Sequence, residues 1–201
     1  SRACLERHVP AAVSERCQLL GLPLPPPSSP CEPILRRLRF IELLSQRHVS
    51  TIAAGENHTL VVGASGVVLS CGGGKESKEH LGHGSEIEGL PIRVPRAMPS
   101  LEGVRVREVS AGSRHSLILS CAGDVYSCGL GYWGQLGLGN EDDITTPQRI
   151  TTVHFGEVSL GEEGTGTPIF SQVSAGSNFS LVLDIYGRVY SFGQGHDYQL
   201  G

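Results

Sequence analysis

The sequence predicts an all-β protein, a partial β-propeller of about three blades that follows a short helical N-terminal segment. Three observations lead to this prediction. A seven-residue motif occurs three times, beginning at Ala54, Ala111 and Ala175. Further glycines follow each motif in register, and a Leu-Gly pair closes each unit. The motifs are 57 and 64 residues apart, which is typical of repeat architectures in which each unit buries its apolar face against the next.

The glycines of the repeat predict tight turns and close contacts between backbones. Counted from the motif glycine, further glycines stand at offsets 11, 17 and 19 in all three units. A glycine at offset 11 supplies the positive φ that a tight hairpin turn needs, and the motif glycine allows a neighbouring backbone to approach. We assign framework roles to these residues and to the motif histidines: Gly55, His58, Gly66, Gly72, Gly112, His115, Gly123, Gly129, Gly176, Gly187 and Gly193.

Each unit contains two short apolar runs that predict the strands of a blade. In the middle unit they are residues 116–119 and 125–127, separated by a break around Gly123. This pattern is typical of a β-hairpin. The runs are nearly continuous, which suits strands covered on both faces, although periodicity alone does not distinguish them from a buried helix. Their β-branched and aromatic residues favour strands, and blades repeated in this way form a propeller.

Residues 1–47 are not part of the repeats, so we predict a separate N-terminal segment there and a repeat domain over residues 48–201. Two helical patterns, over residues 3–20 and 32–46, flank a proline-rich stretch with polyproline character. In the second pattern apolar residues recur at near-helical spacing. This spacing favours a helix that docks on the propeller over a basic recognition helix.

The middle unit carries the most complete repeat. Its segments are residues 109–117, 123–129 and 134–139, followed by the pair Thr146-Pro147. This string resembles the regulator of chromosome condensation repeat family, and the resemblance extends over residues 48–201. The family implies a ring of about seven blades. We therefore expect further blades beyond these three, because an open arc would leave an unpaired strand edge and exposed apolar faces.

Composition and charge argue against nucleic-acid-binding, membrane and secreted proteins. The net charge is −4 and 18% of the residues are charged, with no basic stripe that would attract a phosphate backbone. No apolar run approaches about 18 residues, so no membrane span is expected. The first 20 residues carry charges throughout, which does not fit a signal peptide.

The six cysteines are expected to be reduced. Cys71 and Cys128 occupy the repeat slot that holds Phe192 in the third unit, which indicates a packing position rather than a disulfide. The predicted hairpin places Cys121 opposite Val125, out of register with Cys128. Reduced thiols predict a cytoplasmic or nuclear protein.

Two sets of residues match the composition of enzyme sites, but the predicted secondary structure around them does not fit such sites. Residues 129–134 read Gly-x-Gly-x-x-Gly, which cradles a dinucleotide when a helix follows, but the next residues are unfavourable for a helix. Ser116, His115 and Asp124 lie on one predicted hairpin, where adjacent side chains point to opposite faces and cannot form a triad. We therefore expect no catalytic residue and no cofactor.

The histidines and cysteines also do not predict a metal site. Cys71, His80 and His83 are irregularly spaced, and the first of them lies in a packing slot. The motif histidine of the first two units is replaced by Phe179 in the third. We interpret it as a structural side chain that bonds the backbone of the neighbouring blade, and we expect no metal.

These observations favour a non-catalytic protein-interaction or scaffold propeller, which holds a protein partner on the loops of one rim. The resemblance places such a propeller in a larger protein, such as a ubiquitin-ligase substrate-binding or regulatory subunit. The expected partner is a small GTPase or a ubiquitin-pathway component. Because the inter-unit loops are acidic and vary in length, we assign partner binding to six residues: Glu141, Asp142, Asp143, Glu157, Glu162 and Glu163.

The resemblance leaves two alternatives. The founding family member exchanges nucleotide on a Ran-type small GTPase, so guanine nucleotide exchange is the first. No convincing counterpart of its inserted wedge is present, and residues 157–166 are the only insertion long enough. The second is a tryptophan-based ultraviolet-B receptor, as in plant members of the family. The positions that hold tryptophan there are Glu56, Ser113 and Ser177 in this chain.

Overall fold

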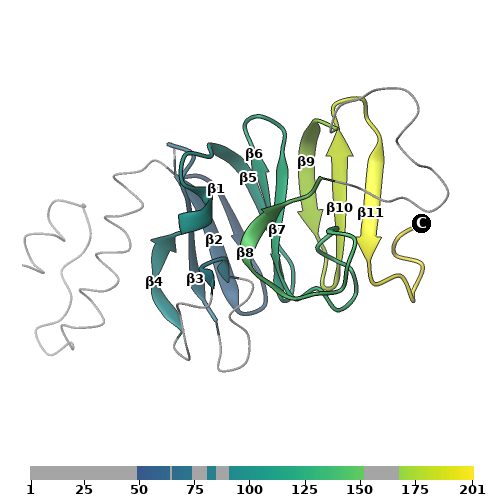
Figure 1. Cartoon of the computed structure of the whole chain (residues 1–201), viewed down its shortest axis with the longest axis horizontal. Helices are drawn as coiled ribbons and strands as arrows, with labels where there is room; N and C mark the ends of the chain where they lie inside the picture. The colour runs from purple at the N-terminus through teal and green to yellow at the C-terminus, as the bar shows by residue number, and fades with distance from the viewer. Residues whose placement is uncertain (1–48, 64, 74–80, 85–90, 152–167) are drawn as a thin grey trace, which may run out of the picture. The chain divides into compact units, whose positions relative to one another are not determined.

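The described part of the chain is built from β-strands, which form three antiparallel sheets (Figure 1). The computed structural model describes residues 49–63, 65–73, 81–84, 91–151 and 168–201. The predicted helical segment, residues 1–47, lies outside these residues, and so does most of the loop that follows the second sheet. Among the helices that the structure describes, none has the length and apolar character of a bilayer span. The predicted all-β fold is confirmed.

Each sheet corresponds to one repeat unit and is called a blade below. Within each blade the strands follow chain order and every neighbouring pair is antiparallel. A short 3-10 helix, η3 (Pro99–Leu101), connects the first two blades. Blade 1 contains β1 (Val49–Ala54), β2 (His58–Gly63), β3 (Val68–Gly72) and β4 (Ile92–Ala97); blade 2 contains β5 (Val106–Ala111), β6 (His115–Ser120), β7 (Val125–Gly129) and β8 (Ile144–Arg149); blade 3 contains β9 (Phe170–Ala175), β10 (Phe179–Asp184) and β11 (Val189–Gly193).

The central hairpin of each blade turns where the sequence predicts it. Gly66, Gly123 and Gly187 have φ angles of 80°, 89° and 82°, which is the left-handed conformation that favours glycine. The predicted register was wrong by two residues, because Leu119 is the residue opposite Val125 and Cys121 lies in the turn. The three described cysteines, Cys71, Cys121 and Cys128, form no disulfide.

The apolar core lies between the blades. In blade 1, Leu60 and Val62 pack against Val109 and Ile118 of blade 2. The alternate residues of β6, Leu117 and Leu119, point to the other side and pack against blade 3, where they meet Phe170, Val173 and Val182. Both faces of β6 are therefore buried, which explains why its apolar run is continuous rather than alternating.

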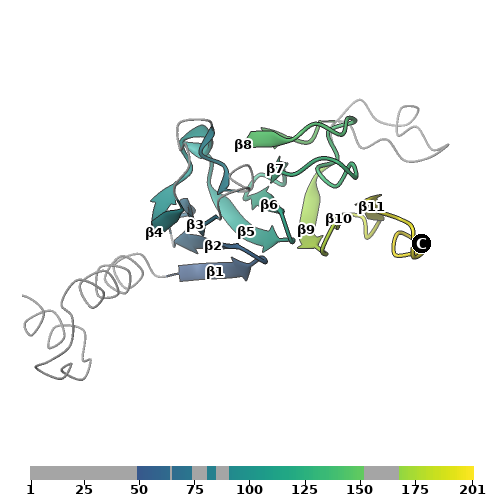
Figure 2. The ribbon, with the colours of Figure 1, turned by 90° about the horizontal axis from the view of Figure 1, so that it is seen from below.

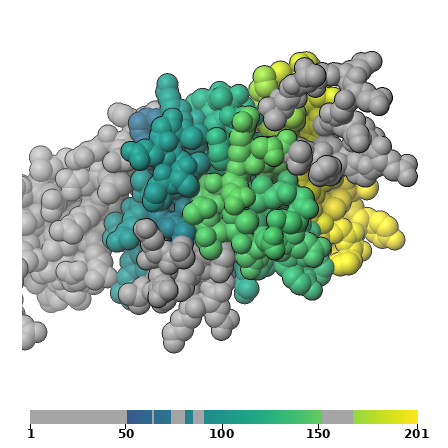
Figure 3. All heavy atoms as spheres, in the orientation of Figure 1, coloured from purple at the N-terminus to yellow at the C-terminus, as the bar shows by residue number. Residues whose placement is uncertain are grey.

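The stacking of the blades can be followed in the remaining views. Figure 2 shows the strands of blade 2 in the order β5, β6, β7, β8 from bottom to top, with β1 along the lower edge of blade 1. Figure 3 shows the atoms of the three blades as one continuous layer, from blue-green through green to yellow. Strand β5 contacts both β1 and β9, so the first strands of successive blades lie next to one another.

Blade 3 has an open apolar face. Val189 is 66% exposed, whereas Val125, at the same position in blade 2, is fully buried. Leu181 and Leu183 are half-buried, whereas their counterparts in blade 2 are fully buried.

Candidate partner-binding rim

The motif histidines connect successive blades. The Nε2 atom of His58 lies 3.0 Å from Ser116 Oγ in blade 2, and that of His115 lies 2.9 Å from Ser180 Oγ in blade 3. For His115 the predicted backbone acceptor was wrong, because its ring bonds a side-chain hydroxyl of the neighbouring blade. Phe179 fills the same slot in blade 3 and has no ring nitrogen.

The hydrogen-bond network determines the tautomer of His115. Ser180 has a single hydroxyl proton, which it donates to the carbonyl oxygen of Gln135 at 2.8 Å. The Nε2–H of His115 must therefore donate to Ser180 Oγ, and Nδ1 carries a lone pair. This Nδ1 atom is buried and has no hydrogen-bond partner among the described residues. Burial lowers the pKa of His115 to about 4, so the ring is neutral at pH 7.

The framework glycines lie against these histidines and against the turns between strands. A Cβ on Gly55 would lie 2.5 Å from the carbonyl oxygen of Gly112, and one on Gly112 would lie 2.6 Å from that of Gly176. Each would also collide with the histidine ring of its own blade. The last glycine of β11, Gly193, has φ 113°, and a Cβ there would lie 2.6 Å from Asn178 O. These positions therefore leave no room for a side chain.

The residues of the hypothetical triad are separated. Ser116 lies beside His58, His115 faces Ser180, and Asp124 forms an ion pair with Arg149 at 2.5 Å. Asp124 is next to the hairpin turn, at the far end of β7 from the residues that pair with His115 and Ser116. Ser116, His115 and Asp124 therefore do not converge on one another.

We expect the Ser116→Ala substitution to leave partner binding unchanged. It removes the hydroxyl beside His58, so the free energy of unfolding should fall by roughly 1 kcal/mol. Hydrolysis of p-nitrophenyl acetate and urea unfolding of the full chain measure the two effects. Loss of a measurable hydrolase activity in a folded variant would contradict the absence of a nucleophile.

Residues 129–134, which have the letters of a dinucleotide-binding motif, and His83, considered as a zinc ligand, make contacts within their own blades. The Gly-x-Gly-x-x-Gly segment forms consecutive turns, in which Gly134 N–H donates to Gly131 O at 2.6 Å and Gly137 N–H to Gly134 O at 3.0 Å. His83 Nε2 lies 2.8 Å from Ser70 Oγ inside blade 1, and His80 lies outside the described residues. Within the part of the chain that the structure describes, no three potential metal ligands gather.

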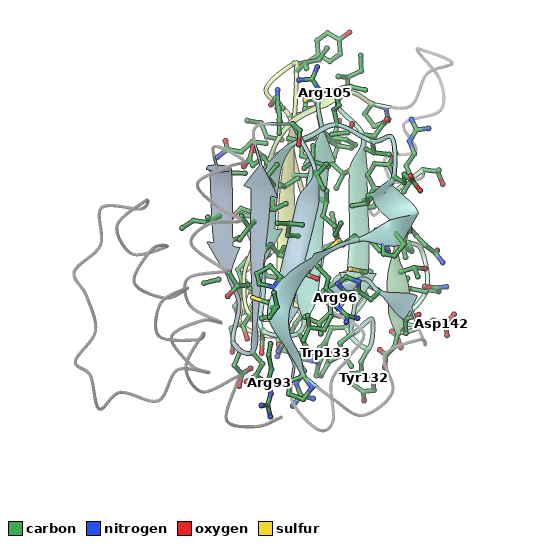
Figure 4. The ribbon with its side chains drawn as sticks, turned by 90° about the vertical axis from the view of Figure 1, so that its left-hand side faces the viewer. Arg93, Arg96, Arg105, Tyr132, Trp133 and Asp142 are labelled. Atoms are coloured by element: carbon green, nitrogen blue, oxygen red, sulfur yellow. The ribbon has the colours of Figure 1, made fainter. Side chains whose placement is uncertain are left out.

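One rim of the array collects the turns of the motif and the long loops of the blades. Leu130 N–H donates to Arg114 O at 2.8 Å, and Gln194 N–H donates to Asn178 O at 2.9 Å. These bonds place the loops 130–143 and 194–201 beside the motif turns. We call this end the loop rim. Figure 4 shows Tyr132, Trp133 and Arg93 at this end of the strands and Arg105 at the opposite end.

The motif turns enclose a shallow hollow of about 450 Å3. Ser113 N–H donates to Ser177 O at 3.0 Å, and Ser113 Oγ donates to Glu56 Oε2. These three residues occupy the positions that hold tryptophan in the plant receptors. The hollow is lined by Ala54, Gly55, Glu56, Ala111, Gly112, Ser113, Ala175, Gly176 and Ser177.

Aromatic rings connect the loops of blades 2 and 3 across the loop rim. The Tyr132 and Trp133 rings meet edge to face with centroids 4.9 Å apart, and the Trp133 and His196 rings do so at 5.3 Å. The backbone N–H of Trp133 donates to Gln135 Oε1 at 2.8 Å, which holds the tip of the loop. We call Tyr132, Trp133 and His196 the aromatic ladder. Sequence reasoning missed it because His196 is distant in the chain from the other two rings.

The loop of blade 3 repeats the shape of the blade 2 loop with one exception. Asp197 N–H donates to Gln199 Oε1 at 2.7 Å, as Trp133 does to Gln135. The next residue is Gly134 in blade 2, with φ 72°, and Tyr198 in blade 3, with φ 60°. Among described residues other than glycine, Tyr198 alone has a positive φ, and its side chain is 91% exposed. Aligning the units would have revealed this replacement.

The acidic residues assigned from sequence have different surroundings. Asp143 Oδ1 accepts the Gly131 N–H at 2.8 Å, so this carboxylate holds the two limbs of the loop together. Asp142 Oδ2 accepts a bond from the Asn140 side-chain amide at 2.9 Å. Glu141 is exposed and makes no polar contact within the described residues. The other three assigned residues, Glu157, Glu162 and Glu163, lie outside the described residues.

Comparisons with known proteins agree with these repeats. A family model described as "Regulator of chromosome condensation (RCC1) repeat" matches residues 65–119 and 122–183, and a second with the same description matches 106–135 and 170–199.

Three relatives have similar sequences. The Ultraviolet-B receptor UVR8 of Arabidopsis thaliana is 31% identical over 80% of this chain and 33% of its own length. The Probable E3 ubiquitin-protein ligase HERC3 of Homo sapiens is 32% identical over 81% of the chain and 14% of its own length. The Guanine nucleotide exchange factor SRM1 of Saccharomyces cerevisiae is 31% identical over 77% of the chain and 32% of its own length. The chain thus spans a third or less of these relatives.

A solved structure has a similar fold. The crystal structure of Prp20p from Saccharomyces cerevisiae, whose title also names its binding to Gsp1p and histones, has a TM-score of 0.59 and is 28% identical. The match covers 77% of this chain and 35% of that chain.

Proposed function

Because the chain belongs to the regulator of chromosome condensation (RCC1) repeat family, we propose that residues 49–201 act as a non-catalytic protein-interaction segment of a β-propeller. The proposed contact surface is the loop rim. One observation carries this proposal: the blade strands bury one another, while the loops 130–143 and 194–201 project exposed acidic and aromatic side chains. Loops held by a rigid stack of sheets are well suited to bind a partner.

The charge of the loop 130–143 favours a basic partner surface. Glu141 and Asp142 are exposed, and the loop 130–143 contains no lysine or arginine. Complementary charge accelerates association, and the effect weakens as salt rises. The similarity to HERC3 supports a ubiquitin-pathway protein as the partner, and the similarity to Prp20p supports a small GTPase.

The double substitution of Glu141 and Asp142 by lysine reverses the charge of the loop. It is expected to slow association with the protein partner several-fold at low salt. Asp143 is left intact because its carboxylate holds Gly131, so the melting temperature should change little. The partner is first identified by affinity purification with the full chain, and the association rate is then measured by surface plasmon resonance. Glu102→Lys, an exposed change at the opposite end of the strands, serves as the control.

A variant in which glycine-serine linkers replace the loops 130–143 and 194–201 tests whether the partner needs the loop rim. Its affinity for the partner is compared with that of the wild-type chain. If the partner still binds with undiminished affinity, the loop rim is not its binding surface. The first 47 residues would then be the element to test for docking.

Guanine nucleotide exchange is the second candidate function, and the similarity to SRM1 favours it. It is tested by the release of a fluorescent GDP analogue from a Ran-type GTPase in the presence of the full chain. Our proposal expects no acceleration, and a catalytic acceleration would establish exchange instead. Light sensing by a tryptophan cluster is not supported, because the chain contains one tryptophan, Trp133.

A further inference from the structure

The hairpin turn of blade 3 carries large apolar residues where the turn of blade 2 carries small ones. Ile185 and Tyr186 occupy the positions of Cys121 and Ala122 in the repeat, and they are 51% and 77% exposed. Ile169, just before β9, is 49% exposed, and its carbonyl oxygen accepts the Ile185 N–H at 3.0 Å. The three residues therefore lie together at one corner of blade 3, at the end of the strands away from the loop rim.

These positions remain exposed where a further blade stacks on the turn. In blade 2 the turn is contacted by blade 3, because the Phe170 N–H donates to Gly123 O at 2.9 Å. The two residues before Gly123 are nevertheless exposed, and so is Arg105, which matches Ile169 and lies at this end of the strands (Figure 4). The corner is thus separate from the open face around Val189, whose counterpart in blade 2 is buried between blades.

A buried carboxylate fixes the conformation of the turn. Asp184 is 2% exposed, and its Oδ1 accepts the backbone N–H groups of Tyr186 and Arg188, both at 2.9 Å. Its Oδ2 accepts the Nε–H of Arg188 at 2.6 Å and the hydroxyl of Tyr190 at 2.8 Å. Burial raises the pKa of this carboxyl, but these bonds outweigh burial and lower the pKa to about 2. The corner is therefore held in one geometry before a partner binds, which reduces the entropy lost on association.

Arg188 supplies the charge of the corner. Its guanidinium carbon lies 5.4 Å from the centroid of the Tyr186 ring, and its side chain is 51% exposed. Its Nε is bonded to Asp184, whereas its two terminal nitrogens make no hydrogen bond or ion pair with the described residues. A second guanidinium lies nearby, because Arg107 donates to the carbonyl oxygen of Ser171, whose hydroxyl donates to Asp184 O at 3.0 Å. Two cations beside one carboxylate favour an anionic group on the partner.

We propose that Ile169, Ile185, Tyr186 and Arg188, which we call the turn corner, bind a segment of a partner protein in which a large apolar side chain stands next to an aspartate or glutamate. The apolar side chain packs on the two isoleucines and the tyrosine ring, and clusters of exposed apolar residues of this kind mark interaction surfaces. The carboxylate bonds the terminal nitrogens of Arg188, which present a planar pair of donors. The turn corner lies opposite the loop rim, so it is a second contact surface and goes beyond the proposed function.

A selection from phage-displayed random peptides tests the chemistry of the turn corner. The full chain is the bait, and the double variant Ile185→Ser, Tyr186→Ala removes the peptides that bind elsewhere. We expect the peptides that only the wild-type chain retains to carry an acidic residue next to a large apolar one. One such peptide is labelled with fluorescein, and its affinity is measured by fluorescence anisotropy. A matched peptide with the acidic residue replaced by its amide should bind about fivefold less tightly.

Single variants of the chain assign the contacts of this peptide. Tyr186→Ala removes the ring of the corner and should lower the affinity about tenfold. Arg188→Lys keeps the charge but loses the planar pair of donors, so the affinity should fall about threefold. Tyr132→Ala removes a ring that is 62% exposed on the loop rim, and it should leave the affinity unchanged. Melting curves show whether each variant is folded.

Three results would overturn the turn corner as this binding site. They are the absence of any peptide that distinguishes the wild-type chain from the double variant, equal binding of the acidic peptide and its amide form, and wild-type affinity in both Tyr186→Ala and Arg188→Lys. Self-association of the wild-type chain in sedimentation velocity, abolished by Tyr186→Ala, would assign the corner to a second copy of the chain instead. These outcomes leave the loop rim untouched, because its own test is the charge reversal at Glu141 and Asp142.

Discussion

The Gly112→Val variant is expected to lose at least about 3 kcal/mol of unfolding free energy relative to the wild-type chain. A side chain here collides with the ring of His115, and its Cβ would lie 2.6 Å from the carbonyl oxygen of Gly176. The carbonyl belongs to the backbone of the next blade, so it cannot move without separating blades 2 and 3. Urea unfolding of the full chain measures the loss.

Two further substitutions separate the causes of this loss. Gly103 has φ 81°, and a Cβ there would meet no atom within 4 Å. The Gly103→Ala variant therefore reports only the cost of an unfavourable φ, a loss of about 1 kcal/mol in the free energy of unfolding. Gly176→Val meets the ring of Phe179 but no backbone of a following blade among its nearest contacts, so its effect should lie between the other two. An unchanged unfolding midpoint for Gly112→Val would refute the close approach of the blades.

Lowering the pH is expected to destabilise the contact between blades 2 and 3 through His115. Its pKa is lowered from 6.5 to about 4 by burial, so between these values the unfolded chain binds more protons than the folded chain. The free energy of unfolding therefore rises with pH across this window, and the stabilisation is complete above pH 6.5 and lost as pH falls toward 4. The contribution of this residue is about 3 kcal/mol.

The His115→Phe variant isolates this effect from the other histidines. Phe179 shows that the slot accepts a phenyl ring, and Ser180 keeps its hydrogen bond to the Gln135 carbonyl, so the cost at pH 7 should be below about 1.5 kcal/mol. The difference in stability between wild type and variant should shrink or reverse as pH falls from 7 to 4. Equal pH dependence in both proteins, measured by urea unfolding, would show that His115 does not titrate in this way.

The local elements of the fold could be predicted from the sequence alone. Gly66, Gly123 and Gly187 recur in register, and steric restriction of φ makes glycine the residue of choice at such turns. The continuous apolar runs predicted strands covered on both faces, and the packing of β6 confirms this. The Phe179 replacement indicated a structural role for the motif histidines, because a catalytic base could not be exchanged for a phenyl ring.

The sequence determined the repeat, its turns, its strands and its family, because these depend on steric limits and spacings that act within one unit of the chain. Only the tertiary structure decided which side chains meet between units. It brought His115 to Ser180 and Trp133 to His196, and it made Asp143 a structural carboxylate. Contacts of this kind depend on how one blade is rotated and shifted against the next, and that geometry follows from the packing of both apolar faces together rather than from any single segment.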